Sequence, residues 1–211
     1  MKKFFFLIAL FSVTSFALSL DQVRTDLNKK SVNRDSSEIK IRTTVSSVAG
    51  KQVVSVYIVQ KGQSRIYTEI KAPFLNQRSI VNGNRMKVID LNTKKFQIVP
   101  YNGEALEALS YTRFNPLDSG EWDEPRFVSE NMYSIKGSRG TLFYDASKKR
   151  IVKIETIDAE KNALTTFDYD DEGKFKVMNT SVISKGKETT VSTEILLLRN
   201  SAKFPDRLFE F

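Results

Sequence analysis

The side chains that most often carry enzymatic chemistry are scarce in this sequence. It contains no His and no Cys, which excludes Ser-His-Asp triads, cysteine nucleophiles and the commonest zinc ligands. Carboxylates remain, and three of them, Glu121, Asp123 and Glu124, flank the single Trp, Trp122. A carboxylate-dependent hydrolase needs two such groups at a fixed separation across a substrate cleft. This acidic group is therefore a minor alternative, and we predict that the protein is not an enzyme.

A second acidic pattern, Asp168-x-Asp170-x-Glu172-Gly173, matches the start of a calcium-binding loop. The twelfth position of such a loop should carry a bidentate Glu, but here it is Asn179. Strand-like sequence flanks the pattern on both sides, so we interpret it as a hairpin turn. The sequence predicts no metal site and no cofactor.

Most of the chain consists of strand-like runs separated by short links. Val, Ile, Thr, Tyr and Phe dominate the runs, and glycines such as Gly50, Gly62, Gly83 and Gly186 mark the links, which is typical of antiparallel hairpins. The predicted strands cover residues 37–48, 52–61, 64–72, 77–82, 85–90, 94–99, 127–136, 140–145, 150–158, 163–170, 173–184 and 187–198. Links this short predict a mainly β protein with an up-and-down meander.

Few segments have the period of a helix. Residues 20–30 place Leu20, Val23 and Leu27 on one helical face, and residues 103–111 group Leu106 with Leu109. The sequence Asn115-Pro116-Leu117-Asp118 looks like an N-cap followed by Pro at the first helical position. These pieces are too small to form a separate layer, but they are suited to closing the mouth of a curved sheet.

Some predicted strands are apolar on both faces, notably residues 53–59 and 195–198, whereas Ile39 and Ile41 alternate with polar neighbours. A curved sheet around an apolar cavity gives this mixture and is a natural site for acyl chains. A packed core explains the same residues, and the sequence leaves both open. The candidate cavity-wall residues are Val54, Val56, Ile58, Ile66 and Ile70.

A second set of candidates belongs to the proposed lid. We expect Phe74, Leu75, Leu106, Leu109 and Trp122 to gather around it and to touch acyl chains, with ordinary core packing as the alternative. Two basic residues nearby, Lys71 and Arg78, are candidates for a ligand headgroup or for pairing with lid carboxylates, with a plain surface charge as the alternative.

Residues 1–19 have the composition of a secretory signal peptide. Lys2 and Lys3 precede an apolar run over residues 4–10, and Ala17 and Ser19 have the small-x-small spacing that signal peptidase recognises. The run is shorter than the about 20 apolar residues of a membrane span. We predict cleavage after Ser19, with Ala17 as the alternative, and a retained anchor is the less favoured interpretation.

The mature chain, residues 20–211, is predicted to be a single soluble domain in the periplasm, since it has no Cys for lipid attachment. Its Lys and Arg residues are scattered, and the densest cluster, Lys148-Lys149-Arg150, lies in a predicted turn. The full sequence has a net charge of +8, to which Lys2 and Lys3 of the predicted signal peptide contribute. Without a basic stripe this charge does not indicate nucleic-acid binding.

Several stretches share a pattern with a known family of exported proteins. Residues 65–73 end at the corner residue Pro73, residues 81–90 contain an Asn-Gly turn, and residues 95–100 lead into a predicted short helix. The end of the chain contains Phe204-Pro205-Asp206-Arg207-Leu208-Phe209. In this order of elements the chain resembles the periplasmic outer-membrane lipoprotein carriers of the LolA/LolB-like superfamily.

The resemblance implies a half-open antiparallel β-barrel of about eleven strands, with helices as a lid and an apolar cavity for lipoprotein acyl chains. It also implies a monomeric carrier or chaperone in outer-membrane lipoprotein sorting. Its partners would be an inner-membrane ATP-driven release complex and an outer-membrane acceptor. A periplasmic sensor or interaction module of the same fold is the alternative. Two positions depart from the pattern: Ala72 replaces a basic residue before the corner Pro, with Lys71 one position earlier, and Val88-Ile89 replaces an aromatic.

Overall fold

The structure is a computed structural model that describes residues 18–29, 36–62, 64–102, 116–118, 120–138, 140–157, 161–200 and 203–211. Its elements are α1 (Leu20–Lys29), β1 (Ser36–Ser47), β2 (Gly50–Lys61), β3 (Arg65–Ala72), β4 (Leu75–Asn82), β5 (Arg85–Asp90), β6 (Phe96–Pro100), the 3-10 helix η1 (Pro116–Asp118), β7 (Arg126–Ser129), β8 (Met132–Gly137), β9 (Gly140–Asp145), β10 (Arg150–Ile157), β11 (Lys161–Tyr169), β12 (Phe175–Ser184), β13 (Lys187–Asn200) and the 3-10 helix η2 (Asp206–Phe209).

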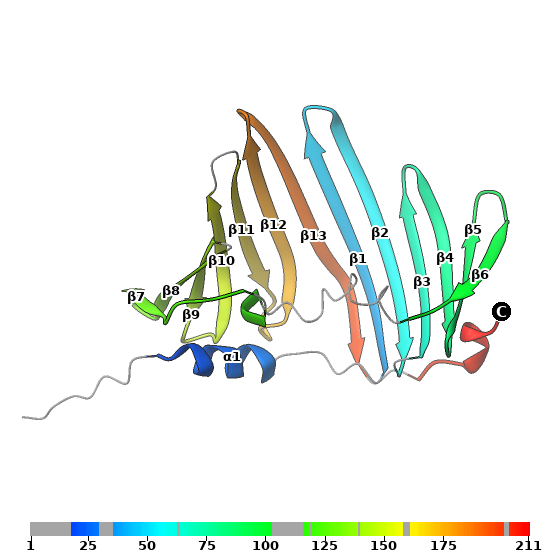
Figure 1. Cartoon of the computed structure of the whole chain (residues 1–211), viewed down its shortest axis with the longest axis horizontal. Helices are drawn as coiled ribbons and strands as arrows, with labels where there is room; N and C mark the ends of the chain where they lie inside the picture. Colours follow the sequence, from blue (N-terminus) through cyan, green and yellow to red (C-terminus); the bar gives the residue numbers. More distant parts are fainter. Residues whose placement is uncertain are drawn as a thin grey trace, which may run out of the picture.

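All thirteen strands belong to one open antiparallel sheet, in the order β6-β5-β4-β3-β2-β1-β13-β12-β11-β10-β9-β8-β7. Strands that are consecutive in sequence are neighbours in the sheet, except β6 and β7, which form its two edges. In the middle, β1 pairs with β13. We call this pairing the seam. The two edge strands, β6 and β7, lie at opposite ends of the long axis (Figure 1). The predicted meander is therefore confirmed as a sheet that does not close on itself.

The predicted strands agree closely with the observed ones, except near residue 130. The sequence suggested a single strand over residues 127–136, but the chain forms β7 and β8 with a turn at Glu130-Asn131. Asn131 has a φ of 59° in this turn, a conformation that Asn tolerates better than most residues. Without a Gly or Pro the turn gave no strong sequence signal.

The two faces of the sheet differ in character, because residues directly opposite one another on antiparallel strands point to the same side. One face, which we call the apolar face, carries two buried clusters. The cluster over β1–β4 contains Ile39, Ile41, Ile58, Ile66 and Val81, and the cluster over β8–β11 contains Ile135, Leu142, Tyr144, Ile151 and Phe167.

The predicted N-terminal helix is confirmed as α1, and it covers the second of these clusters. Leu20 and Val23 are buried in that cluster, with Leu27 half-buried beside them. Figure 1 shows α1 at one end of the sheet, beside β9 and β10. The predicted short turn is confirmed as η1, whose Leu117 is buried in the same cluster.

The opposite face is covered at its other end by the C-terminal tail. Phe209 of η2 is buried against Val59, Tyr67 and Ile80 of β2–β4. The carboxylate of Asp206 pairs with Lys61 at 2.6 Å and with Arg65 at 2.7 Å. The tail and α1 therefore pack on different faces and on different halves of the sheet.

Two expectations on helices remain. The predicted helix over residues 103–111 lies outside the described residues. Within the described ranges, no helix is long and apolar enough to cross a bilayer.

Candidate functional site

The apolar face continues between the two buried clusters as rows of mostly half-buried side chains, in which Thr193 and Phe167 are buried. Register places the members of each row directly opposite one another on successive strands. One row is Val54, Thr43, Thr193, Met178 and Phe167, and the next is Val45, Val191, Thr180, Thr165 and Ile154. These rows make one apolar surface from β2 to β10 across the seam.

The threonine hydroxyls in these rows hydrogen-bond to one another, which keeps the surface largely apolar. The hydroxyl oxygens of Thr43 and Thr193 lie 3.1 Å apart across the seam, and those of Thr165 and Thr180 lie 3.0 Å apart between β11 and β12. A hydroxyl that is already hydrogen-bonded costs less to cover with an apolar ligand than a free one. The methyl group of each Thr then adds to the apolar surface.

The sequence-predicted cavity-wall residues all lie on the apolar face. Val54, Val56 and Ile58 alternate along β2, while Ile66 and Ile70 occupy facing positions of β3. Ile58 and Ile66 are buried in the β1–β4 cluster, whereas Val54, Val56 and Ile70 are half-buried. The structure thus brings the five predicted wall residues together on one face of β2 and β3.

The expected lid group is not brought together among the described residues. Phe74 and Leu75 lie at the β3–β4 corner, where the Phe74 side chain is 89% exposed. Trp122 packs beside the cluster under α1, and its backbone bridges to Gly137 of β8. Leu106 and Leu109 lie outside the described residues. The expectation of one lid does not place Phe74 and Trp122 together, since the β3–β4 corner and β8 belong to different halves of the sheet.

Lys71 and Arg78 lie on the face opposite the candidate wall residues. The Arg78 guanidinium donates to the Glu69 carboxylate, with N–O distances of 3.0 and 2.6 Å, and lies over the Tyr67 ring. Lys71 is exposed in β3. Arg78 therefore has a carboxylate partner on the neighbouring strand rather than on a lid.

The polar groups around Arg78 form a network on this opposite face. The hydroxyl of Tyr67 donates to Glu69, and that of Tyr57 donates to Glu38 at 2.8 Å. Burial, followed by these hydrogen bonds, raises the pKa of Tyr57 and of Tyr67 to about 12. Both hydroxyls therefore stay protonated and act as donors at neutral pH.

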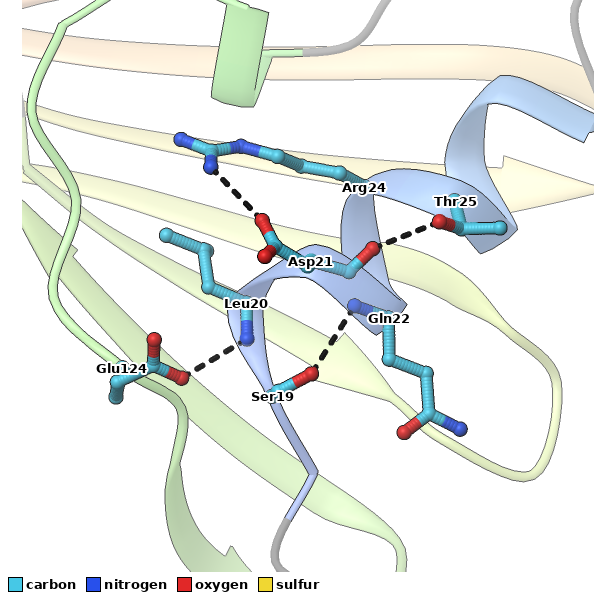
Figure 2. A network of polar contacts seen from close by, with 7 residues as sticks. All are labelled: Ser19, Leu20, Asp21, Gln22, Arg24, Thr25 and Glu124. Carbon is cyan, nitrogen blue, oxygen red and sulfur yellow. Dashed lines mark hydrogen bonds and ion pairs between the residues drawn. The ribbon is translucent and has the colours of Figure 1, made fainter.

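Polar contacts hold α1 in place at both ends. At its start, the backbone N–H of Leu20 donates to Glu124 Oε2 at 2.9 Å, and Ser19 Oγ accepts from the N–H of Gln22 at 3.2 Å (Figure 2). Further along, the hydroxyl of Tyr144 donates to the buried carboxylate of Asp26 at 3.1 Å, and Lys149 lies 3.7 Å from Asp26. Burial and Asp26 together raise the pKa of Tyr144.

The acidic pattern around Trp122 does not form a hydrolytic pair in the described residues. Glu124 is engaged by α1, and Glu121 and Asp123 are exposed. The carboxyl groups of the described chain whose pKa departs from its ordinary value, such as Asp145 and Asp206, are all shifted downward. A general acid needs the opposite shift.

The calcium-like pattern is confirmed as a turn. The carboxylate of Asp170 accepts the N–H of Lys174 at 2.8 Å, and the carbonyl of Asp170 accepts the N–H of Gly173. Across the described ranges, no group of three His, Cys, Asp or Glu side chains could hold a metal ion.

Sequence reasoning missed the part of the site that lies on β1 and on the strands beyond the seam. The positions are Thr43, Val45, Ala163, Thr165, Met178, Thr180, Val191 and Thr193. A signal was present, since Thr189, Val191 and Thr193 alternate with polar residues at the strand period of two. These short, partly polar side chains looked like ordinary surface strand residues.

Comparison with known proteins identifies the fold. No protein-family model and no curated protein matches the sequence. The solved structure of a LolA superfamily protein from Nitrosomonas europaea is 12% identical, with a TM-score of 0.51, and the match covers 92% of this chain and 99% of that one. A structure described as an outer membrane lipoprotein-sorting protein domain, from Vibrio parahaemolyticus, is 8% identical with a TM-score of 0.50, covering 89% of this chain and 94% of that one. The chain therefore has the open LolA-like fold that the sequence pattern suggested.

Proposed function

We propose that this protein binds the acyl chains of lipoproteins or lipids on its apolar face and carries them through the periplasm toward the outer membrane. The observation that supports this most is the half-buried apolar surface between the two buried clusters. A face filled by its own side chains would be buried throughout. Here Val54, Val56 and Ile70 stay partly accessible beside fully buried neighbours.

The size of this surface suits an acyl chain. Strands lie about 4.8 Å apart, so the rows from β2 to β11 cross about 20 Å. The hydrocarbon of one bilayer leaflet is about 15 Å thick, so a typical acyl chain fits across these rows. Burying it contributes about 0.8 kcal/mol per methylene, or on the order of 10 kcal/mol for a long chain.

Binding of this strength requires assistance for loading and release. Release requires a second state of the protein whose affinity for the acyl chain is lower. In this state the apolar face would be less accessible. We assign loading to an inner-membrane ATP-driven complex and release to an outer-membrane acceptor, the partners that the resemblance in sequence pattern implies. In this proposal the protein performs no catalysis.

Two adjacent residues of β2 provide a matched test. Val54 is half-buried on the apolar face, whereas Val53 points to the opposite face and is 39% exposed. We expect Val54→Asp to weaken binding of a fluorescent fatty acid at least tenfold, because an acyl chain would cover an unpaired carboxylate. Val53→Asp should bind like the wild type. If Val54→Asp does not fold, Val54→Ser offers a milder version of the same comparison.

Native mass spectrometry of the protein isolated from the periplasm supplies the second measurement. We expect a bound lipid or lipoprotein that dissociates on unfolding. Absence of any bound lipid, together with no fatty-acid binding in solution, would overturn the proposal. Deleting the gene then separates a carrier from a sensor, since only loss of a carrier mislocalises lipoproteins.

A further inference from the structure

A basic and aromatic patch occupies the outer face of the β5–β6 edge. Arg85 and Lys87 of β5 lie directly opposite Pro100 and Ile98 of β6, on the face that points away from the apolar face. Phe96 of β6 shares this side. The Phe96 side chain is 61% exposed and that of Ile98 is 41% exposed.

Each cation of this patch lies over an aromatic ring. The ammonium nitrogen of Lys87 is 4.5 Å from the centre of the Phe96 ring, and the Arg85 guanidinium is 5.6 Å from the centre of the Phe211 ring. Phe211 is 41% exposed, so the C-terminal tail extends the patch beyond the sheet. Apolar bodies beside cationic tips are the arrangement that suits a lipid–water interface.

The surrounding charge favours an anionic partner. Lys94 and Lys95 form the turn that precedes β6, and both are exposed. The nearby acidic side chain, Asp90, folds back to accept the N–H groups of Asn92 and Thr93. In the described part of the chain, Arg85, Lys87, Lys94 and Lys95 form no ion pair.

The strand edge beside the patch is poorly suited to pairing with another strand. Pro100 has no backbone N–H that could bond to an added strand. At the other end, the consecutive residues Lys94 and Lys95 directly precede β6, and their charges disfavour edge-to-edge association. A surface depression of about 330 Å³ lies next to Arg85, lined also by Asn84, Ile98, Val99 and Pro100. It gives a lipid headgroup room beside the guanidinium.

We propose that this patch docks the protein on membranes that carry anionic phospholipid, with Phe96, Ile98 and Phe211 at the interface. The proposal adds a membrane-docking surface to the carrier role and does not use the apolar face. Cargo could then be exchanged while the carrier rests on the bilayer surface.

Sedimentation with vesicles tests this docking. The full mature protein should bind vesicles of mixed phosphatidylglycerol and phosphatidylethanolamine, lose binding as salt rises, and bind pure phosphatidylcholine weakly. Arg85→Gln with Lys87→Gln should weaken binding about 25-fold, since each basic group near an anionic surface contributes roughly fivefold. Phe96→Ser with Phe211→Ser should weaken it by a similar factor.

Matched controls come from elsewhere on the surface. Lys40→Gln with Lys136→Gln removes the same charge from exposed positions outside the patch, and Phe127→Ser removes a Phe that is 68% exposed on the other edge strand. These variants should bind as the wild type does. Equal binding to neutral vesicles, or unchanged binding by the patch variants, would overturn the proposal.

Two further readouts separate this proposal from others. The patch variants should retain fatty-acid binding, and Val54→Asp should retain vesicle binding, so docking and carriage can fail independently. A dimer in sedimentation velocity that Phe96→Ser dissociates would assign the patch to self-association and overturn membrane docking.

A second inference concerns the residues immediately before α1. Leu18 is half-buried and packs against the cluster under α1. Ser19 caps the helix, with Oγ accepting from Gln22 at 3.2 Å (Figure 2). The Ser19 carbonyl also accepts the N–H of Val23 at 3.2 Å. Both residues therefore belong to the folded domain.

Cleavage after Ser19 would remove these contacts. The new ammonium group of Leu20 would still face Glu124, at the 2.9 Å that now separates the Leu20 N–H from the carboxylate. However, a positive charge at a helix N-terminus opposes the helix dipole, and the N-cap and the first helical hydrogen bond would be gone.

We infer that signal peptidase hydrolyses the peptide bond between Ala17 and Leu18. The C–N bond breaks, and water gives its hydroxyl to the new carboxyl group of Ala17 and a proton to the new amine of Leu18. Ser15 and Ala17 provide the small-x-small pair for this cut. The inference depends on the predicted signal peptide and is independent of the carrier role.

Intact-mass spectrometry of the exported protein tests the position. A mass that begins at Leu18 is expected, and a mass that begins at Leu20, or an uncleaved chain, would overturn the inference. Two purified versions that begin at Leu18 and at Leu20 give a second measurement. The folding equilibrium constant of the longer version should be about tenfold larger, because it retains the cap; equal constants would contradict the structural reason for the cut.

Discussion

Glu69 shows how single residues stabilise the strands behind the apolar face. Its carboxylate accepts hydrogen bonds from Tyr67 and Arg78, all on the opposite face of β3 and β4. The Tyr67 ring packs edge-on against Tyr57, whose hydroxyl is bound by Glu38. The network thus joins β1 to β4 without taking part in the candidate site.

This arrangement makes part of the stability dependent on pH. Burial alone would raise the pKa of Glu69, but the hydrogen bonds from Tyr67 and Arg78 outweigh it and hold the pKa below its ordinary value of 4.5. The unfolded chain then binds more protons in acid, so stability rises with pH. We expect this contribution to be complete above about pH 5 and to be lost as the pH falls through the folded pKa.

Urea unfolding between pH 3 and pH 7 measures this effect. Glu69→Gln should flatten the acid limb of the stability curve, although Asp145 and Asp206, whose pKa values are also lowered, keep part of it. Glu210→Gln, at an exposed position, should leave the curve unchanged. An unaltered acid limb in Glu69→Gln would contradict the assignment.

Tyr144 gives a second prediction at the level of one hydroxyl group. It is fully buried, and its hydroxyl donates to the buried carboxylate of Asp26 in α1. Tyr144→Phe should lower the free energy of unfolding by about 1–3 kcal/mol, since the carboxylate loses a donor. Tyr133→Phe is the control, because no hydrogen bond of its hydroxyl occurs among the described residues. Similar losses in both variants would refute a role for this contact.

At the level of elements, the packing of Trp122 depends on Gly137 of β8. A Cβ at position 137 would lie 2.4 Å from the Trp122 ring and 2.6 Å from the Glu121 carbonyl. We therefore expect Gly137→Ala to displace the ring and to shift the fluorescence of this single Trp to longer wavelength. Lys136→Ala, at the exposed neighbouring position, should leave the spectrum unchanged. An unshifted spectrum in Gly137→Ala would show that the strand adjusts instead.

The tail element η2 depends on Phe209. This side chain is buried against three strands, whereas Phe211 is 41% exposed. Phe209→Ala should cost about 3–5 kcal/mol of stability, and Phe211→Ala should cost much less. Urea denaturation of both variants measures the difference. Comparable losses would mean that the tail is not anchored through Phe209.

The sequence predicted the elements better than their positions in space. Strands were recognisable because Val, Ile and Thr alternate and Gly residues mark most turns, and α1 because Leu20, Val23 and Leu27 recur at the helical period. The β7–β8 turn was missed because Asn131 alone enters the left-handed region there. Strand alternation also predicted correctly that Val54, Val56 and Ile58 share a face.

The sequence could not show that the first strand, β1, pairs with the last strand, β13. Hairpin turns fix the register between consecutive strands, but no turn links β1 with β13. The other half of the candidate surface, including Thr165, Thr180 and Thr193, becomes visible only once this pairing is known. The same pairing shows that Trp122 and Phe74, which the expected lid grouped together, lie in different halves of the sheet.

The seam also predicts how the whole molecule unfolds. Because β1 and β13 are long and pair from Ser37 opposite Asn200 to Ser46 opposite Thr190, the two halves should lose structure together. Trp122 fluorescence, which reports the half under α1, and far-ultraviolet circular dichroism, which reports all strands, should give the same urea midpoint. Two separate midpoints would show that the halves are independent.

The same pairing determines when the fold can be completed. Residues 36–47 must wait for residues 187–200, so a chain that emerges from a ribosome or a translocation channel in N-to-C order exposes the unpaired edge of β1 until almost its last residues arrive. Long-range pairing of this kind is slow and leaves intermediates open to aggregation. We therefore expect the chain to stay unfolded until β13 has been made, a state that suits passage through a membrane pore and binding by chaperones that shield strand edges.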